Sequence, residues 1–127
     1  MSGAPLFRAV HQGGPVTVGH ASPEDLAALP GYPDPGSVRD VLERWSLVAI
    51  RFSGDRTEIH ALGWRVAERN TWITSPLVAM DMDASMVATR SGHAYRLGTR
   101  DGAGVAPGLR SHLAYALRTW GFTDVQS

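Results

Sequence analysis

Cysteine and lysine are both absent from this chain of 127 residues. Without cysteine, disulfides, thiolate metal sites and a cysteine nucleophile are excluded, and the composition fits a reducing compartment. Without lysine, all twelve basic residues are arginines, and they balance twelve acidic residues. The formal net charge of zero therefore provides no global field that would draw the protein onto nucleic acid or an anionic membrane.

Long apolar runs are missing as well. Arginine, aspartate or glycine interrupts every hydrophobic stretch before it reaches the roughly 18 to 20 residues that a membrane-spanning helix needs. The first residues, Met1 to Arg8, lack the basic and apolar regions of a secretory signal. We therefore expect a small soluble protein with a cytoplasmic location and no contact with a membrane.

The length and the hydrophobic content of 43% suffice for one core but not for two. Residues 1–22 are rich in glycine and proline, and only Pro15–Val18 alternates enough to form a short strand. We predict a loose N-terminal arm over residues 1–22, followed by a single α+β domain over residues 23–127.

Helix signals occur at three places in that domain. Ser22 can cap a short helix that starts at Pro23 and ends by Leu29. After a proline-rich turn at residues 32–36, Ser37 begins a second helix with an apolar face from Val38 to Trp45. Leucines and alanines at three- and four-residue spacing predict a last helix over residues 107–120.

Between these helices the hydrophobic period changes to two, which is typical of strands. Residues 46–52 and 57–68 form two strands, the second with a bulge near Leu62–Gly63, and residues 72–98 form a meander of three. A two-residue turn within Arg90–His93 places Ala88 opposite Tyr95. The predicted fold is α+β: a five-stranded antiparallel curled sheet or small open barrel, with two short N-terminal helices and a C-terminal helix packed on one face.

One pattern within the meander resembles a known group of proteins. Thr74-Ser-Pro76, followed by Thr89-Arg-Ser-Gly92, Tyr95 and Leu97-Gly98, is similar to a hairpin pattern of small uncharacterised bacterial and phage proteins. The resemblance covers about a fifth of the chain and implies no activity. The same residues are also those that a hairpin requires for folding alone.

Candidate catalytic and metal-binding groups do not converge in the predicted fold. Asp81 and Asp83 lie at one end of the meander and His93 at the other, roughly 15 Å away at 3.3 Å per residue. Ser91 and His93 lack the strand-to-helix elbow and the oxyanion-hole amides of a hydrolase. We predict no catalytic residue, no metal site and no cofactor, and an unrecognised hydrolase or metal-dependent enzyme stays open as an alternative.

The outer face of the sheet carries the candidate binding residues. Side-chain parity places Arg51, Arg65 and Arg96 on this face, together with Thr89 and His60, and Arg90 at its rim. Guanidinium groups can bind a phosphate backbone or an acidic protein surface. The alternatives are that these arginines only keep the protein soluble, and that a GC-rich genome explains their number.

These observations favour a non-enzymatic binding protein that engages a macromolecular partner, another protein, through the arginine-bearing face. An inhibitor or regulator encoded by a phage or mobile element suits the size and the hairpin resemblance. The alternative is a small nucleic-acid-binding domain, whose affinity would fall steeply with salt. An edge strand at Pro15–Val18 or Ser46–Phe52 also favours a homodimer.

Overall fold

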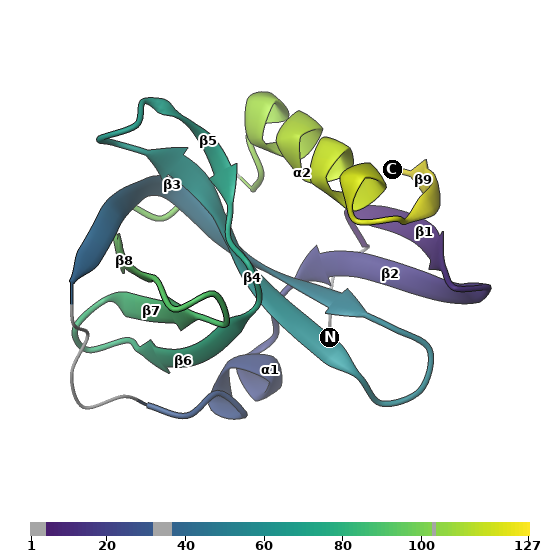
Figure 1. Ribbon diagram of the computed structural model, residues 1–127, viewed down its shortest axis with the longest axis horizontal. Coiled ribbons are helices and arrows are strands. Elements are labelled where there is room, and N and C mark those ends of the chain that lie inside the picture. Colours follow the sequence, from purple (N-terminus) through teal and green to yellow (C-terminus); the bar gives the residue numbers. More distant parts are fainter. Residues whose placement is uncertain (1–4, 32–36, 103) are drawn as a thin grey trace.

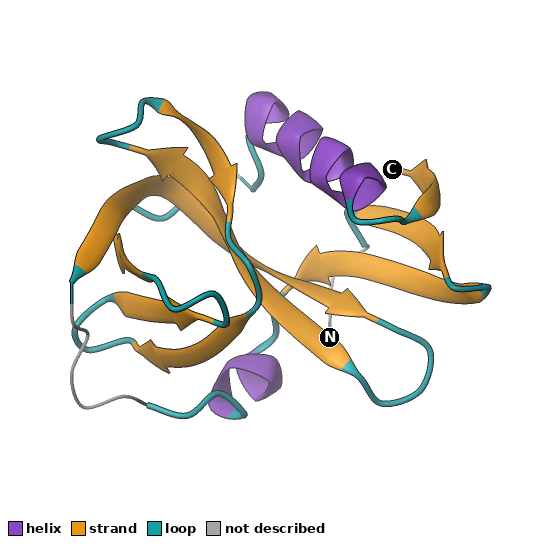
Figure 2. Cartoon of the chain, in the orientation of Figure 1, coloured by secondary structure: helices purple, strands orange, loops and turns teal. Residues whose placement is uncertain are grey.

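A computed structural model describes residues 5–31, 37–102 and 104–127 of the chain. Over these ranges nine strands form one mixed sheet and two helices accompany it (Figure 1, Figure 2). The elements are β1 (Phe7–His11), β2 (Gly14–His20), α1 (Pro23–Ala27), β3 (Val38–Arg51), β4 (Thr57–Arg65), β5 (Asn70–Ile73), β6 (Leu77–Asp81), β7 (Met86–Thr89), β8 (Ala94–Leu97), α2 (Pro107–Thr119) and β9 (Thr123–Gln126).

The long strand β3 is the spine of the sheet. One of its edges pairs with β8 in parallel over its first half and with β2 in antiparallel orientation over its second half. The other edge pairs with β4, which continues to β5. Apart from β4 and β5, the strand order is β6-β7-β8-β3-β2-β1-β9, so β3 joins two smaller sheets that curl away from each other (Figure 1).

A bulge in the middle of β3 produces the bend between these two sheets. Glu43 pairs with Trp64 and Ser46 with Leu62, so two residues of β3 stand opposite Gly63 alone. A Cβ atom on Gly63 would lie 3.1 Å from the carbonyl oxygen of Glu43, which is why glycine is needed there. The predicted bulge is thus found at this place, but the extra residue belongs to β3 instead of β4.

Two hydrophobic clusters fill the two sides of the sheet. The buried face of α2 packs on the first cluster, which includes Val18, Val48 and Ile50. The second cluster lies on the opposite face, against β6, β7 and β8, and α1 contributes Leu26 to its margin. Each fully buried leucine or isoleucine contributes roughly 1.5 to 3 kcal/mol, so both clusters hold the single sheet together.

The predicted fold class is wrong in its elements. Among the described residues there are nine strands and two helices, instead of five strands and three helices, and the sheet is mixed instead of antiparallel. The predicted second helix from Ser37 is the first half of β3. Apolar residues at Val38, Val41, Leu42 and Trp45 fit a helix locally, but backbone pairing with β4 and β8, which are distant in sequence, decides the conformation.

Residues 1–22 were predicted as a loose arm, yet within them the structure places β1 and β2. Phe7, Ala9, Val16 and Val18 are buried in the first cluster. The strand at Pro15–Val18 is confirmed, but β2 lies between β1 and β3. Since the second half of β3 lies between β2 and β4, neither strand predicted to mediate a homodimer presents a free edge.

The first and last predicted helices are confirmed. Ser22 and Asp25 form a capping box at the start of α1, and α2 ends close to Gly121, which has a φ of 93°. The predicted turn at residues 32–36 lies outside the described residues.

The meander is confirmed with a different register, in which Val87 pairs with Tyr95 and Ala88 with Ala94. The Thr89 N–H donates to the carbonyl of His93 at 2.8 Å, so the turn spans Arg90–Gly92 and is one residue longer than predicted. Gly92 has a φ of 89°, as the third position of such a turn requires.

Candidate functional site

A cleft of about 420 Å³ opens where β4, β5, the turn between β7 and β8 and the segment after α2 meet. We name it the His60 cleft. Its lining residues are His11, Phe52, Arg56, Glu58, His60, Trp72, Ile73, Ser75, Pro76, Arg90, Trp120 and Phe122. The cleft combines aromatic walls with a cluster of charged side chains.

His60 lies at the floor of the cleft with only 2% of its surface exposed. Its Nδ1 atom is 2.7 Å from the carbonyl oxygen of Thr74, which can only accept, so Nδ1 carries a proton and donates. The other ring nitrogen, Nε2, is buried and has no hydrogen-bond partner among the described residues. In the neutral ring Nε2 is therefore an acceptor, 3.8 Å from the Glu58 carboxylate, and its direction is fixed by the bond to Thr74.

The indole of Trp72 places a second unpartnered polar atom at the same cleft. Its Nε1–H is buried and meets no acceptor in the part of the chain that the structure describes, and an indole N–H can only donate. Buried polar atoms are nearly always paired, because leaving one unpaired costs about 1 to 3 kcal/mol. Two such atoms belong to residues that line this one cleft, which makes it the candidate functional site.

Glu58 organises the charges at the cleft. Its carboxylate lies 3.8 Å from Nε2 of His60, 3.3 Å from Nη2 of Arg56 and 3.4 Å from Nη2 of Arg90. In its protonated form the His60 ring, followed by the two guanidinium groups, lowers the pKa of Glu58 from 4.5 to about 2, against the opposing effect of burial. The side chains of Arg56 and Arg90 are 61% and 63% exposed, so both retain donors toward solvent at the mouth.

The aromatic side chains of the cleft are also arranged around His60 and the arginines. Trp120 stacks on the His60 ring with centroids 5.0 Å apart and planes inclined by 26°. The guanidinium carbon of Arg56 lies 4.1 Å from the centroid of the Phe52 ring. Trp120 keeps 38% of its surface exposed, so part of this aromatic wall is open to a further ring.

Two of the residues that the sequence predicts as binding residues meet here. His60 and Arg90 belong to the cleft and are connected through Glu58. Thr89 is buried next to Arg90, where its hydroxyl accepts a hydrogen bond from the backbone N–H of His93. Thr89 therefore supports the turn that presents Arg90 instead of lining the cleft.

The predicted face shared by three arginines is not present. Arg65 pairs with Leu42 and Arg96 pairs with Val41. Because Val41 and Leu42 are consecutive residues of one strand, their partners point to opposite faces of the sheet. Arg51 is engaged elsewhere, since its guanidinium donates two hydrogen bonds to the Asp25 carboxylate at 2.9 and 2.6 Å.

Sequence reasoning missed Arg56, Glu58, Trp72 and Trp120. A signal for the first two is present, because Glu58 and His60 lie two residues apart on β4, Arg56 lies two residues before Glu58, and all three line the cleft. The two tryptophans carry no such signal, since only the folded chain brings β5 and the end of α2 together at His60.

Ser91 and His93, which the sequence analysis rejects as a catalytic pair, do touch in the folded chain. The hydroxyl of Ser91 lies 3.1 Å from Nδ1 of His93, and Nη1 of Arg39 lies 3.3 Å from Nε2. Arginine can only donate, so Nε2 accepts and Nδ1 carries the proton. An Nδ1–H group donates toward the serine and cannot remove its proton, so this contact is structural.

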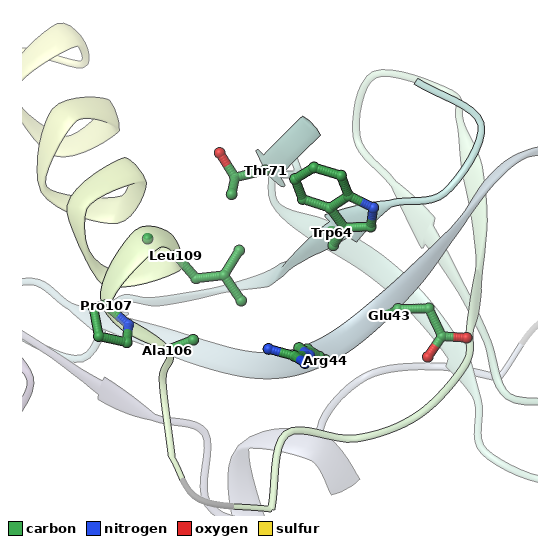
Figure 3. Close-up of a pocket in the computed structure, with 8 residues that line it drawn as sticks. Glu43, Arg44, Trp64, Thr71, Ala106, Pro107 and Leu109 are labelled. Atoms are coloured by element: carbon green, nitrogen blue, oxygen red, sulfur yellow. The ribbon is translucent and has the colours of Figure 1, made fainter. Parts of the chain in front are cut away.

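A second cavity, of about 570 Å³, lies at the other end of α2, and we name it the helix-start cavity. In Figure 3, Pro107 and Leu109 approach it from α2, while Trp64 and Thr71 approach it from the hairpin of β4 and β5. Its other lining residues are Glu43, Arg44, Ala106 and Gly108. Among the described residues, no buried side-chain N or O atom that lines this cavity lacks a partner.

Within the described ranges, no three histidine, aspartate or glutamate side chains converge so as to hold a metal ion. Neither of the helices in these ranges has the length and apolar character required to cross a bilayer.

Comparisons of the chain with protein-family models, with curated proteins and with solved structures found no match. The similarity of the hairpin at residues 74–98 to small bacterial and phage proteins stays a prediction.

Proposed function

We propose that this chain is a non-enzymatic binding protein and that it receives an anionic segment of a macromolecular partner in the His60 cleft. The observation that carries the proposal is the pair of buried, unpartnered polar atoms, Nε2 of His60 and Nε1 of Trp72, at a cleft bordered by two exposed arginines. This assignment moves the predicted binding site from an open sheet face to a concave one.

The sign of the ligand charge follows from the charges at the mouth. Arg56 and Arg90 together carry two positive charges and Glu58 carries one negative charge, which leaves an excess of one positive charge. Glu58 occupies only part of the five donors of each guanidinium. The remaining donors suit a phosphate or a carboxylate group.

The same geometry favours binding over acid–base catalysis. A carboxylate with a pKa of about 2 is a weak base at neutral pH, whereas a general base works best with a pKa close to the working pH. Glu58 is therefore suited to hold Arg56, Arg90 and His60 in place. The alternative is an enzyme of the hydrolase class, and hydrolysis of a bound ligand would favour that alternative.

Two anionic polymers with the same number of charges test the proposal. We would measure the binding of a labelled dodecaglutamate peptide and of a labelled single-stranded twelve-nucleotide DNA by fluorescence anisotropy. Saturable binding of either polymer is expected, and the double variant R56S/R90S should weaken it by about tenfold or more, because both guanidinium groups are lost.

The matched control is R8S/R96S, which removes two exposed arginines outside the cleft and leaves the same net charge as the test variant. Its affinity should stay close to that of the unaltered protein. Equal losses in the two double variants would show attraction by net charge alone and would contradict the proposal, as would failure of both polymers to bind.

A further inference from the structure

We propose that the ligand of the His60 cleft is a nucleotide, either free or as one unit of a single-stranded nucleic acid. This inference rests on the proposed binding function and names the chemical class of its ligand. It follows from three properties of the cleft: the donor and acceptor at its floor, its ring-lined wall and its two arginines.

The floor offers one donor and one acceptor. The Trp72 Nε1–H can only donate, and the neutral His60 ring accepts at Nε2 because Nδ1 donates to Thr74. A ligand that satisfies both atoms must itself carry an acceptor and a donor. The edges of nucleobases have this pair, whereas a carboxylate has acceptors only and would leave Nε2 of His60 unpaired.

The wall favours a planar ring over a flexible chain. His60 and Trp120 already form a stack, and the exposed part of Trp120 can extend it by one more ring. Phe52, covered by the Arg56 guanidinium, adds a second flat surface. A peptide bond also carries a donor and an acceptor, but it has no ring that could use these surfaces, and stacking on aromatic side chains is a common way to hold single-stranded bases.

The phosphate of the nucleotide would bind at the mouth of the cleft. Arg56 and Arg90 both approach Glu58, so their guanidinium groups lie close together with donors left over. The cleft volume of about 420 Å³ is within the range of about 300 to 1,000 Å³ that is usual for small-ligand sites. A base at the floor and a phosphate at the arginines would pair both unpartnered atoms and the remaining guanidinium donors.

The experiment separates base recognition from phosphate recognition. Calorimetry would compare uridine monophosphate and the other three ribonucleotides with ribose 5-phosphate, which lacks the base, and with the dodecaglutamate peptide. At least one nucleotide should bind about tenfold more tightly than ribose 5-phosphate, since only the nucleotide reaches Trp72 and Trp120. W72F, which retains a ring but not the N–H, should remove most of that preference and leave ribose 5-phosphate unaffected.

The source of the nucleotide is decided by comparing the monophosphates with single-stranded twelve-nucleotide RNA and with its duplex. Tighter binding of the single strand than of the monophosphates identifies the strand as the ligand, and similar affinities identify the free nucleotide. A duplex bound as tightly as the single strand would overturn the inference, because paired bases cannot enter the cleft.

Failure of the inference is distinguishable from failure of the proposed function. Binding of dodecaglutamate that depends on Arg56 and Arg90, without any nucleotide binding, would overturn the inference and retain an anion-binding cleft. Loss of binding in W72F must not come from unfolding, so its circular dichroism and urea midpoint would be compared with those of W64F, the same substitution in the helix-start cavity.

Discussion

The two cavities at the ends of α2 differ in what they require from a ligand. The helix-start cavity is the larger, at about 570 Å³ compared with about 420 Å³ for the His60 cleft. Yet two of its polar groups are used within the chain: Glu43 accepts from the Thr99 N–H at 2.8 Å, and the Thr71 hydroxyl lies 2.7 Å from Nδ1 of His112. The His60 cleft, in contrast, contains both unpartnered atoms. Volume alone is therefore a poorer guide to function here than unmet hydrogen bonding.

The origin of the two cavities explains this difference. The helix-start cavity lies beside the bulge of β3, where Arg44 has a φ of 52° and the strand turns away from the start of α2. It is a packing gap next to a bend that the fold needs. The unpaired Nε2 of His60 has no hydrogen-bonding role in the fold, since the bond to the Thr74 carbonyl is made by Nδ1 alone.

The largest effect is expected at the helix-start cavity. Leu109 is 4% exposed and belongs to the first hydrophobic cluster, so L109A should lower the free energy of unfolding by about 3 kcal/mol, through lost burial and a larger void. Binding of anionic polymers by the folded variant should not change. Urea unfolding would measure the stability and fluorescence anisotropy the binding. A tenfold loss of affinity in the fully folded L109A variant would contradict the stated difference between the two cavities.

The next largest effect is a difference in stability between two tryptophan-to-phenylalanine variants, W45F and W72F. Nε1 of Trp45 donates to the carbonyl of Gly98 at 3.0 Å, so W45F should destabilise the protein by about 2 kcal/mol. Trp72 has no such bond, and W72F should cost less than about 1 kcal/mol, because removing an unpaired N–H offsets part of the lost packing. Equal losses of stability in urea would show that the Trp72 N–H is satisfied in solution.

The smallest effect concerns Glu58 and depends on pH. Its pKa of about 2 in the folded chain lies below the ordinary 4.5, so its stabilisation is present above about pH 4.5 and is lost as the pH falls toward 2. E58Q should lower the free energy of unfolding by about 1 kcal/mol at pH 7, since the arginine partners are exposed and screened. The difference between the two proteins should vanish near pH 2.

This pH profile can be measured from urea midpoints between pH 7 and pH 2.5. E43Q, at the helix-start cavity, is the matched change: it removes the charge but keeps an amide oxygen that can accept from the Thr99 N–H. If the free energy of unfolding of the wild type exceeded that of E58Q by more as the pH falls, the charge arrangement described for the His60 cleft would be contradicted.

Part of the fold and of the site was predictable from local patterns. The capping box at Ser22 and Asp25 and the leucine spacing in α2 act over three or four residues, and both helices are confirmed. The first half of β3 was not predictable in this way, because its apolar spacing also fits a helix. Asp40 favours the strand by accepting hydrogen bonds from the backbone N–H groups of Ala67 and Glu68, which lie more than 25 residues away.

By itself the sequence determined the chemistry available to this protein: no thiol, no lysine, a balance of charges, and the placement of Arg56, Glu58 and His60 at alternate positions of the chain. Only the tertiary structure decided which of these groups work together. The bulge opposite Gly63 and the packing of α2 on the sheet bring Trp72, Trp120 and Arg90 to His60. The physical reason is that burial and hydrogen-bond pairing are properties of segments that meet only after folding, so the unpaired atoms of the His60 cleft cannot be seen in any local pattern.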